Sequence, residues 1–330
     1  MFGYLALIIF LILIPLWVRH QYYLHVFIIM FLFSIPAIGL RLIWRTGHVS
    51  FAQAGFMAIG GYTSAILVKF LGFNFWLAWL IGGITAAIIA IAIGIPTLKL
   101  QSSYFFLVTT AMGEVTRLSF LYLWTPVFGG AIGITNVPRP NPIAIPGLFR
   151  LEFVTKTSFY YLLLFVLIIT VVVMRRIDKS RIGATLQAIR DAEDLARAVG
   201  MPTMRYRVFA FATACFFAGI AGGIYAHYNM QVSPLSFPNF VSMEIFAFVV
   251  VGGTGHVLGP VLGTIVLKGI GEAVRGVGPY EIIFSGALMM LVMIFMPSGL
   301  LGVPKAVATF IRKRFGTLKS RTEVNGGPTA

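Results

Sequence analysis

Apolar segments of about the length of a membrane-spanning helix repeat along nearly the whole chain, separated by short polar gaps. A helix needs about 20 mostly apolar residues to cross the hydrocarbon core of a bilayer. Several of the segments are short or contain glycine, so eight or nine spans are alternatives to ten. The pattern predicts an all-α integral membrane protein with about ten transmembrane helices. The ten segments are residues 2–18, 24–44, 48–69, 75–96, 103–124, 158–174, 206–228, 240–253, 257–271 and 280–296.

Composition supports a membrane protein and argues against two soluble domains. Only 11% of the 330 residues are charged, whereas soluble domains average about 25%. We therefore expect a single transmembrane domain over residues 1–304, followed by a basic cytoplasmic tail over residues 305–330. Segment 2–18 has neither a basic region before it nor a small-residue cleavage site, so we interpret it as a first span and not as a removable signal peptide.

The positive charges lie in the gaps between the apolar segments. The net charge is +15, and 17 of the 25 Lys and Arg residues fall in four groups. With ten spans, all four groups and both termini lie on the same side, which the bias of Lys and Arg toward cytoplasmic loops identifies as the cytoplasmic side. This clustering also argues against a nucleic-acid-binding surface. The groups are Arg41 with Arg45, Lys99 alone, eight residues from Arg175 to Arg207, and six from Lys305 to Arg321.

The sequence lacks the motifs of common nucleotide-dependent and metal-dependent enzymes. It has no G-x-x-x-x-G-K-[ST] motif, and its glycine-rich segment 252–260 lacks the lysine that would contact phosphates. Its five histidines are not spaced as metal ligands, and Cys215 is its one cysteine. We therefore expect a chain that is not an enzyme, binds no metal or other cofactor, and hydrolyses no nucleotide itself.

Two connections between the predicted spans are long. The first, 125–157, is rich in Gly and Pro, which disfavour a regular helix. The topology places it outside, where it is either a surface loop or a docking platform for an external partner. The second, 175–205, lies on the cytoplasmic side and contains a charged stretch over 184–200.

The charged stretch 184–200 is predicted to form one helix of about four turns. Gly200 and Pro202 supply the usual stop signals at its end. Its alanine-rich apolar stripe and its two Arg against three acidic residues favour docking on another protein over attachment to the lipid surface. On a helical wheel the stripe occupies about 120° and consists of Ala188, Ile189, Ala192, Leu195, Ala196 and Val199.

Ionisable residues within the predicted spans are candidates for function because their burial in a membrane is unfavourable. Glu114 and Arg117 are spaced i,i+3, so they can form an ion pair that either stabilises the bundle or contacts a substrate. Glu244 lies near the start of its span. Arg41 and Lys268 are long enough to extend to the membrane interface.

The segment 47–64 combines glycines with polar side chains inside a predicted span. Small residues allow close helix packing, and polar residues form hydrogen bonds between helices. A broken or polar helix is also tolerated where it lines a cavity. Helix packing and a translocation path therefore both remain open for this segment and for similar residues elsewhere. The candidates are Gly47, Ser50, Gln53, Gly60, Tyr62, Thr63, Glu114, Gly252, Gly253 and Gly255.

Four motifs occur along the chain in a fixed order. They are GHVSFAQAGF at 47–56 with GGYT at 60–63, GGAIGI at 129–134, AIRDAE at 188–193 with Gly200, and the glycines from Gly252 to Gly263 with PSGLLG at 297–302. Over residues 20–302 the chain resembles the permease subunits of branched-chain amino acid ABC transporters. Phe51 and Ala52 stand where that family more often has Leu and Gly.

The resemblance implies a binding-protein-dependent importer in a bacterial or archaeal plasma (inner) membrane, multi-pass and with both termini cytoplasmic. Its partners would be a second related permease subunit (as a heterodimer or a homodimer), two cytoplasmic ATPase subunits that bind ATP, an external solute-binding protein and the lipid bilayer. In such transporters a short cytoplasmic helix docks on the ATPase, and 184–200 is suited to that role. The implied coupling residues are Ala188, Ile189, Arg190, Asp191, Glu193, Ala196 and Gly200.

Other functions and symmetries stay open at this point. An ion- or proton-coupled secondary transporter would need paired intramembrane carboxylates, for which Glu114 and Glu244 are the candidates. A permease for urea or amides, a channel and a structural membrane subunit are further alternatives. The sequence TGHV at 46–49 recurs at 254–257, which is too short to decide whether the chain has two pseudo-symmetric halves.

Overall fold

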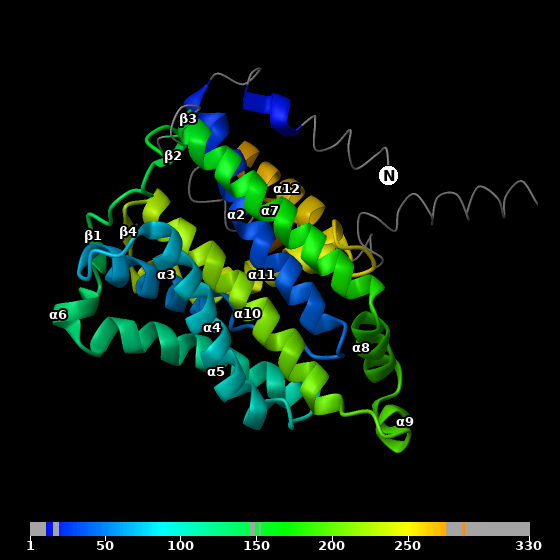
Figure 1. Ribbon diagram of the computed structural model, residues 1–330. Coiled ribbons are helices and arrows are strands. Elements are labelled where there is room, and N and C mark those ends of the chain that lie inside the picture. Colours follow the sequence, from blue (N-terminus) through cyan, green and yellow to red (C-terminus); the bar gives the residue numbers. More distant parts are fainter. Residues whose placement is uncertain (1–10, 16–19, 146–148, 152, 275–285, 288–330) are drawn as a thin grey trace, which may run out of the picture.

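The computed structural model describes residues 11–15, 20–145, 149–151, 153–274 and 286–287, and its main elements are helices (Figure 1). The helices are α2 (Gln21–Trp44), α3 (Gln53–Lys69), α4 (Phe75–Thr97), α5 (Ser102–Tyr122), α6 (Thr125–Phe128), α7 (Lys156–Lys179), α8 (Arg181–Asp191), α9 (Glu193–Ala198), α10 (Thr203–Tyr228), α11 (Asn239–Gly252), α12 (Gly259–Val274) and the 3₁₀ turn η1 (Pro234–Ser236). The strands are β1 (Ile134–Thr135), β2 (Ile143–Ile145), β3 (Phe149–Leu151) and β4 (Gln231–Val232).

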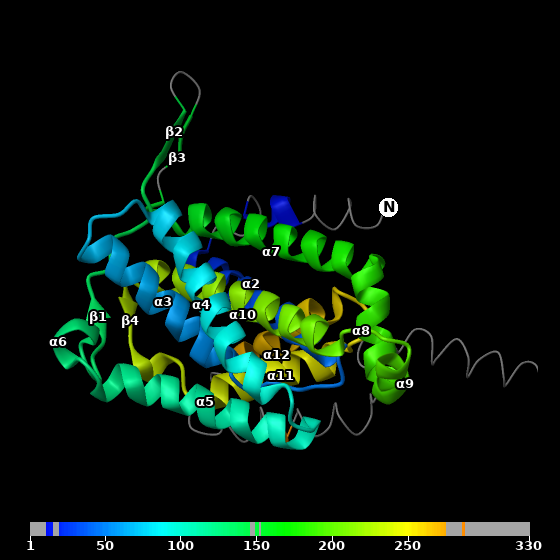
Figure 2. The ribbon, with the colours of Figure 1, turned by 60° about the horizontal axis from the view of Figure 1, so that its bottom comes forward.

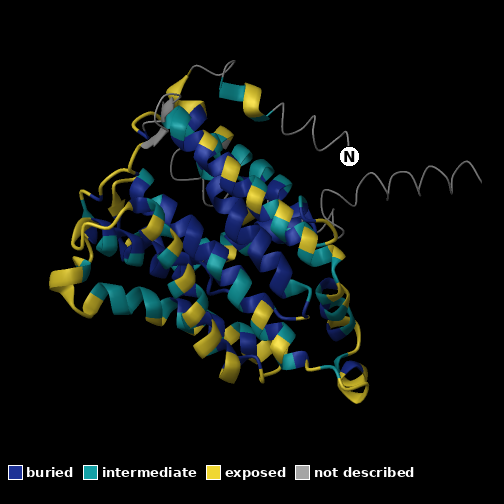
Figure 3. Cartoon of the chain, in the orientation of Figure 1, coloured by how far each residue is buried: buried dark blue, intermediate teal, exposed yellow. Residues whose placement is uncertain are grey.

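Helix α2 is the centre of the bundle. Every residue from Met30 to Ile43 is buried, and α7, α10, α11 and α12 pack around this helix. Burial falls toward the outer faces of the surrounding helices (Figure 3). There the exposed side chains are still apolar, such as Leu77 and Ile88 of α4. Apolar side chains on both the inside and the outside are expected of helices that are surrounded by lipid.

The eight predicted spans between residues 24 and 271 each coincide with a helix, which confirms an all-α membrane protein. Among the described residues, five stretches are long and apolar enough to cross a membrane, namely α2, α4, α7, α10 and Pro234–Gly252. The predicted third span is wrong at its start, because residues 48–52 are not helical and α3 begins at Gln53. The predicted spans 2–18 and 280–296 lie largely, and the tail 305–330 entirely, outside the described residues.

The loops gather at two opposite ends of the bundle. At the basic end, defined here by residues 41–48, 97–102, 178–205 and 253–258, contacts join all four segments. Arg45 donates a hydrogen bond to Gln187 (3.4 Å), Ser102 donates to the Gly47 carbonyl (2.9 Å), and Arg41 donates to the Thr254 carbonyl (2.8 Å). Three of the four predicted basic groups therefore lie at one end. The fourth belongs to the tail.

The opposite end holds the long connection between α5 and α7. Its strand β1 pairs with β4 (Ile134 opposite Val232), and Lys69 donates a hydrogen bond to the Thr135 carbonyl at 2.6 Å. Strands β2 and β3 form a separate antiparallel pair that projects away from the bundle (Figure 2). The connection therefore contains one strand pair of its own and a strand that pairs with β4, despite its Gly and Pro content.

Glycines bring α3, α4 and α10 into direct backbone contact. A Cβ atom at Gly60 would overlap the backbone of Gly219, and one at Gly222 would overlap the backbone of Met57. A Cβ at Gly82 would lie 2.7 Å from the Gly60 carbonyl oxygen. These contacts are those of small-residue packing between membrane helices, so Gly60 has a packing role.

Candidate functional site

The predicted single helix over 184–200 is wrong, because the structure divides this segment into two helices. Helix α8 ends at Asp191, and α9 begins at Glu193. Between them Ala192 is extended, with φ −156° and ψ 83°, values that no α-helix accommodates. The two helices extend beyond the rest of the bundle at the basic end (Figures 1 and 2).

The break divides the predicted apolar stripe between two environments. Ile189 of α8 and Ala196 of α9 are buried, with 1% and 5% of their surfaces exposed. Leu195 and Val199 are 66% and 70% exposed. The α8–α9 segment (residues 181–199) thus uses half of its apolar side chains to pack on its own bundle and presents the other half to the exterior.

Ion pairs attach the base of this segment to the centre of the bundle. Asp178, in the last turn of α7, lies 2.9 Å from Arg41 and 2.5 Å from Arg45 of the α2 end. The Arg41 side chain is only 2% exposed. Arg41 therefore does not extend to the membrane interface as predicted, but is buried with Asp178, an acid flanked by basic residues, as its partner.

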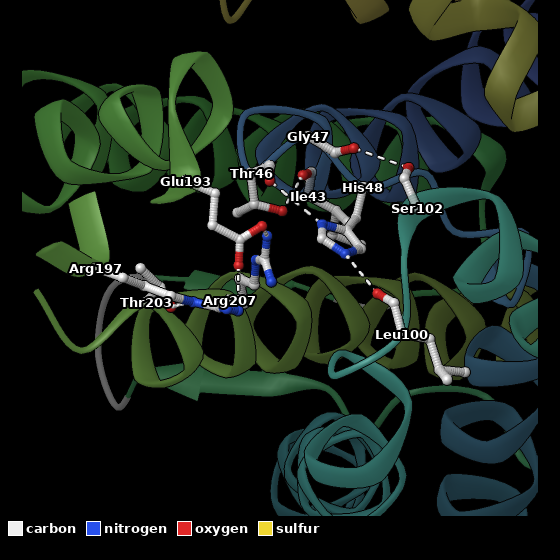
Figure 4. Close-up of polar contacts among 10 residues, drawn as sticks. All are labelled: Ile43, Thr46, Gly47, His48, Leu100, Ser102, Glu193, Arg197, Thr203 and Arg207. Atoms are coloured by element: carbon white, nitrogen blue, oxygen red, sulfur yellow. Dashed lines mark hydrogen bonds and ion pairs between the residues drawn. The ribbon is translucent and has the colours of Figure 1, made fainter. Parts of the chain in front are cut away.

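A second set of contacts attaches α9 to α10 (Figure 4). Glu193 pairs with Arg197 of its own helix at 2.5 Å and with Arg207 of α10. Arg197 also donates a hydrogen bond to the Thr203 hydroxyl at 3.4 Å. Because the Arg207 side chain is 6% exposed, Glu193 supplies the counter-charge of a buried guanidinium. Glu193 therefore links the two helices within this chain.

The other predicted coupling residues lie on the same segment. Ala188 is half-buried, Arg190 is exposed, and Asp191 accepts a hydrogen bond from Gln187 at 3.3 Å. Gly200 ends the segment with φ +84°, a left-handed conformation that glycine adopts readily. Sequence reasoning found this segment but missed its attachments through Asp178 and Arg207.

A second candidate site lies where three helices meet at mid-depth, the mid-bundle junction (Ser50, Gln53, Thr109, Gly113 and Ser242). The amide of Phe51 donates to Thr109 of α5 at 3.2 Å, and the amide of Ala54 donates to Ser242 of α11 at 3.0 Å. The N-termini of α3 and α11 therefore face each other beside the middle of α5. Helix N-termini inside a membrane supply free N–H groups and positive potential.

Gln53 is the exceptional residue of the junction. It is fully buried, and neither its amide oxygen nor its amide nitrogen has a hydrogen-bond partner. A buried polar group without a partner is unfavourable and calls for an explanation. Ser50, by contrast, accepts a hydrogen bond from the Ala52 amide at 3.3 Å and so helps to begin α3.

The remaining predicted path residues do not converge on the junction. Gly47, Gly252, Gly253 and Gly255 lie at the basic end, where Gly252 packs against Gly259 and Gly255 has open space around it. Tyr62 lies further along α3, where its ring stacks on Phe120 of α5 at 4.2 Å, and Thr63 beside it is half-buried. Glu114 lies on α5 and is 34% exposed.

The charged residues that the sequence places within spans form ion pairs. Glu114 accepts a hydrogen bond from Arg117 at 2.9 Å, which confirms the predicted i,i+3 pair. Glu244 and Lys268 lie 2.7 Å apart between α11 and α12, so both have a partner inside the bundle, which the sequence analysis missed. At the basic end, burial lowers the pKa of the His256 ring, and the nearby positive charge of Arg41 lowers this pKa further. Within the described residues, no group of three or more His, Cys, Asp or Glu side chains is placed to hold a metal ion.

Residues 22–297 match the family described as "Branched-chain amino acid transport system / permease component". The chain belongs to this family. The permease is 32% identical over 295 residues to the "High-affinity branched-chain amino acid transport system permease protein LivM" of Escherichia coli K12, covering 82% of the permease and 68% of LivM. It is 24% identical to the corresponding LivH of the same organism, covering 83% and 92% of the two chains.

An archaeal relative extends the comparison. The permease is 23% identical to a "Probable branched-chain amino acid transport permease protein LivH" of Methanocaldococcus jannaschii, over 82% of the permease and 89% of that protein. LivM and LivH relatives in one organism indicate a pair of permeases within a transport system. No solved structure matches the permease.

Proposed function

We propose that the permease carries branched-chain or similar small amino acids into the cell as one of two related membrane subunits, driven by ATP hydrolysis on separate ATPase subunits. Its family supports the substrate class, because the relatives named above are branched-chain amino acid permeases. The observation that carries the coupling role is the α8–α9 segment, which is attached to the bundle at its base and exposes apolar side chains at its tip.

The coupling mechanism follows from where the segment is attached. An ATPase that moves after binding ATP would push or pull on Leu195 and Val199. Glu193 would transmit this displacement to Arg207 and α10, and Asp178 would transmit it to Arg41 and α2. Buried ion pairs suit such a link because separating the partners leaves an uncompensated charge, so the helices move together.

The translocation path would run beside α5 and the mid-bundle junction. Helix α5 buries only Phe105, Thr109 and Gly113, so most of its surface is available to a second permease subunit. We propose that the two subunits enclose the path between them. The Gln53 amide and the N-termini of α3 and α11 would then bind the polar groups of an amino acid when the junction opens.

Uptake by reconstituted vesicles tests the proposal. The permease, its partner permease, the ATPase subunits and the solute-binding protein are incorporated in liposomes, and leucine uptake is measured with and without internal ATP. We expect uptake that requires ATP hydrolysis and is inhibited by isoleucine and valine. Uptake driven by an ion gradient without ATP would contradict the proposal, and inhibition by urea or short amides alone would contradict the substrate class.

A secondary transporter is less well supported. The two carboxylates that the sequence offers for proton or ion coupling, Glu114 and Glu244, each pair with a basic side chain. Neither carboxylate is therefore an unpaired site for a transported cation.

A further inference from the structure

The outward face of α7 carries a continuous stripe of exposed side chains that changes from apolar to basic. The exposed residues are spaced three or four positions apart, which is the spacing of residues on one face of a helix. Phe165 is 62% exposed and Val172 is 48% exposed, while the other face of α7 packs on α2. The exposed residues of this α7 stripe are Tyr161, Phe165, Ile169, Val172, Arg176 and Lys179.

The basic end of the stripe opens into a hollow of about 420 Å³, lined by Val172, Arg175, Arg176, Lys179 and Ser180. Ser180 is both the residue after α7 and the residue that precedes α8, so the negative end of the α7 dipole and the positive end of the α8 dipole meet here and offset each other. The positive charge of the hollow therefore comes from its side chains. The neighbouring acid, Asp178, is engaged by Arg41 and Arg45. Among the described lining residues three are cationic and none carries a carboxylate.

The apolar part of the stripe has the length of one lipid leaflet. Residues 161 to 172 extend over about 16 Å at about 1.5 Å per residue. This length is about half of the roughly 30 Å hydrocarbon core of a bilayer. An acyl chain along the stripe would thus bring its headgroup to the level of Arg176 and Lys179.

We propose that this hollow binds the phosphate of an anionic phospholipid whose acyl chains lie along the α7 stripe. Guanidinium groups bind phosphate oxygens with directed hydrogen bonds, and a lysine adds a compact charge. A lipid with net negative charge is favoured over a zwitterionic lipid because the described lining of the hollow is cationic. Helix α7 lies across the bundle from α5, the side we assign to the partner permease (Figure 2). The stripe is bounded at Tyr161, which donates a hydrogen bond to the Ile12 carbonyl at 3.3 Å. From Phe165 to Lys179 its exposed side chains are left to face the bilayer.

Bound lipid would also stabilise the corner from which the α8–α9 segment extends. The hollow spans the last two turns of α7 and Ser180, the residue between α7 and α8, so a headgroup there contacts the junction of the two helices. The binding site itself does not depend on the transported solute or on the energy source. Its test therefore measures lipid binding and not uptake.

Native mass spectrometry of the full-length permease, purified together with its partner subunits, measures this binding directly. The complex is titrated with phosphatidylglycerol and, separately, with phosphatidylcholine of the same acyl chains. We expect the preference for phosphatidylglycerol to fall roughly tenfold or more in the double variant Arg176→Gln/Lys179→Gln. The control Lys99→Gln/Arg205→Gln removes the same charge from exposed positions near the basic end and should retain the preference.

A photo-crosslinking residue at Val172 provides a second measurement in native membranes. We expect crosslinks to lipid. Crosslinks to another protein subunit would overturn the proposal, since they would make the α7 stripe a protein interface. The proposal would also be overturned if Arg176→Gln/Lys179→Gln and Lys99→Gln/Arg205→Gln showed the same preference for phosphatidylglycerol. Displacement of phosphatidylglycerol by an equal concentration of inorganic phosphate would overturn the proposal as well.

Discussion

The glycine contacts among α3, α4 and α10 and the attachments of the α8–α9 segment hold helices together in opposite ways. The first are contacts of backbone against backbone, in which an added Cβ at Gly60 or Gly222 would overlap neighbouring atoms. The second are a few ion pairs, around Asp178 and Glu193, with exposed apolar residues beyond them. Close packing fixes the distance between helices, whereas a small number of charged contacts lets a segment act as a lever that moves with its attachments.

The largest loss of folding is expected from Gly222→Ala in α10. The new Cβ would overlap the backbone of Met57, and backbone cannot move aside as a flexible side chain does. Overpacking a tight core typically costs about 1–3 kcal/mol, and we expect the upper part of that range. The yield of monodisperse protein and the melting temperature in detergent measure the effect.

Gly271→Ala is the matched control for this substitution. Gly271 also lies in a helix, but nothing approaches within 4 Å of the position of its Cβ. We expect unchanged or slightly increased stability, because alanine favours the helix. Equal melting temperatures for the two variants would show that the glycine contacts do not determine the packing.

A smaller loss of stability with a large loss of coupling is expected from Glu193→Gln. This change leaves Arg207 buried without its counter-charge, at a cost of about 1–3 kcal/mol. Asp194→Asn makes the same type of change at an exposed position of the same helix and should leave both properties unchanged. Melting temperature together with ATP-driven uptake separates the two variants, and normal uptake by Glu193→Gln would contradict the link from α9 to α10.

Little or no loss of stability is expected from Gln53→Leu at the mid-bundle junction. Replacing an unpartnered buried amide with an apolar side chain of similar size removes an unfavourable burial. If the amide binds the solute during transport, KM for uptake rises while the melting temperature stays the same or increases. Gln101→Leu, at an exposed position, should change neither value. A lower melting temperature with normal KM would assign Gln53 to packing.

The sequence predicts the bundle well because membrane spans follow directly from the length of apolar segments. Eight spans and the Glu114–Arg117 pair could be predicted from the sequence, since each depends on residues that are close in the sequence. The pairs Arg41–Asp178 and Arg207–Glu193 could not be predicted from the sequence. They join residues 137 and 14 positions apart, respectively, and depend on how the helices pack. The break at Ala192 was missed for a related reason. The residues 184–200 favour a helix locally, and tertiary contacts of α8 and α9 override that preference.

The most direct test of the coupling role is the double substitution Leu195→Asp/Val199→Asp at the exposed tip of the α8–α9 segment. Ile132→Asp, at a residue 70% exposed at the opposite end, is the control. Copurification of the ATPase subunits with the permease is measured alongside the melting temperature. We predict that the double variant folds normally and loses the ATPase subunits, while the control retains them. Retention of the ATPase subunits by the double variant would contradict the account.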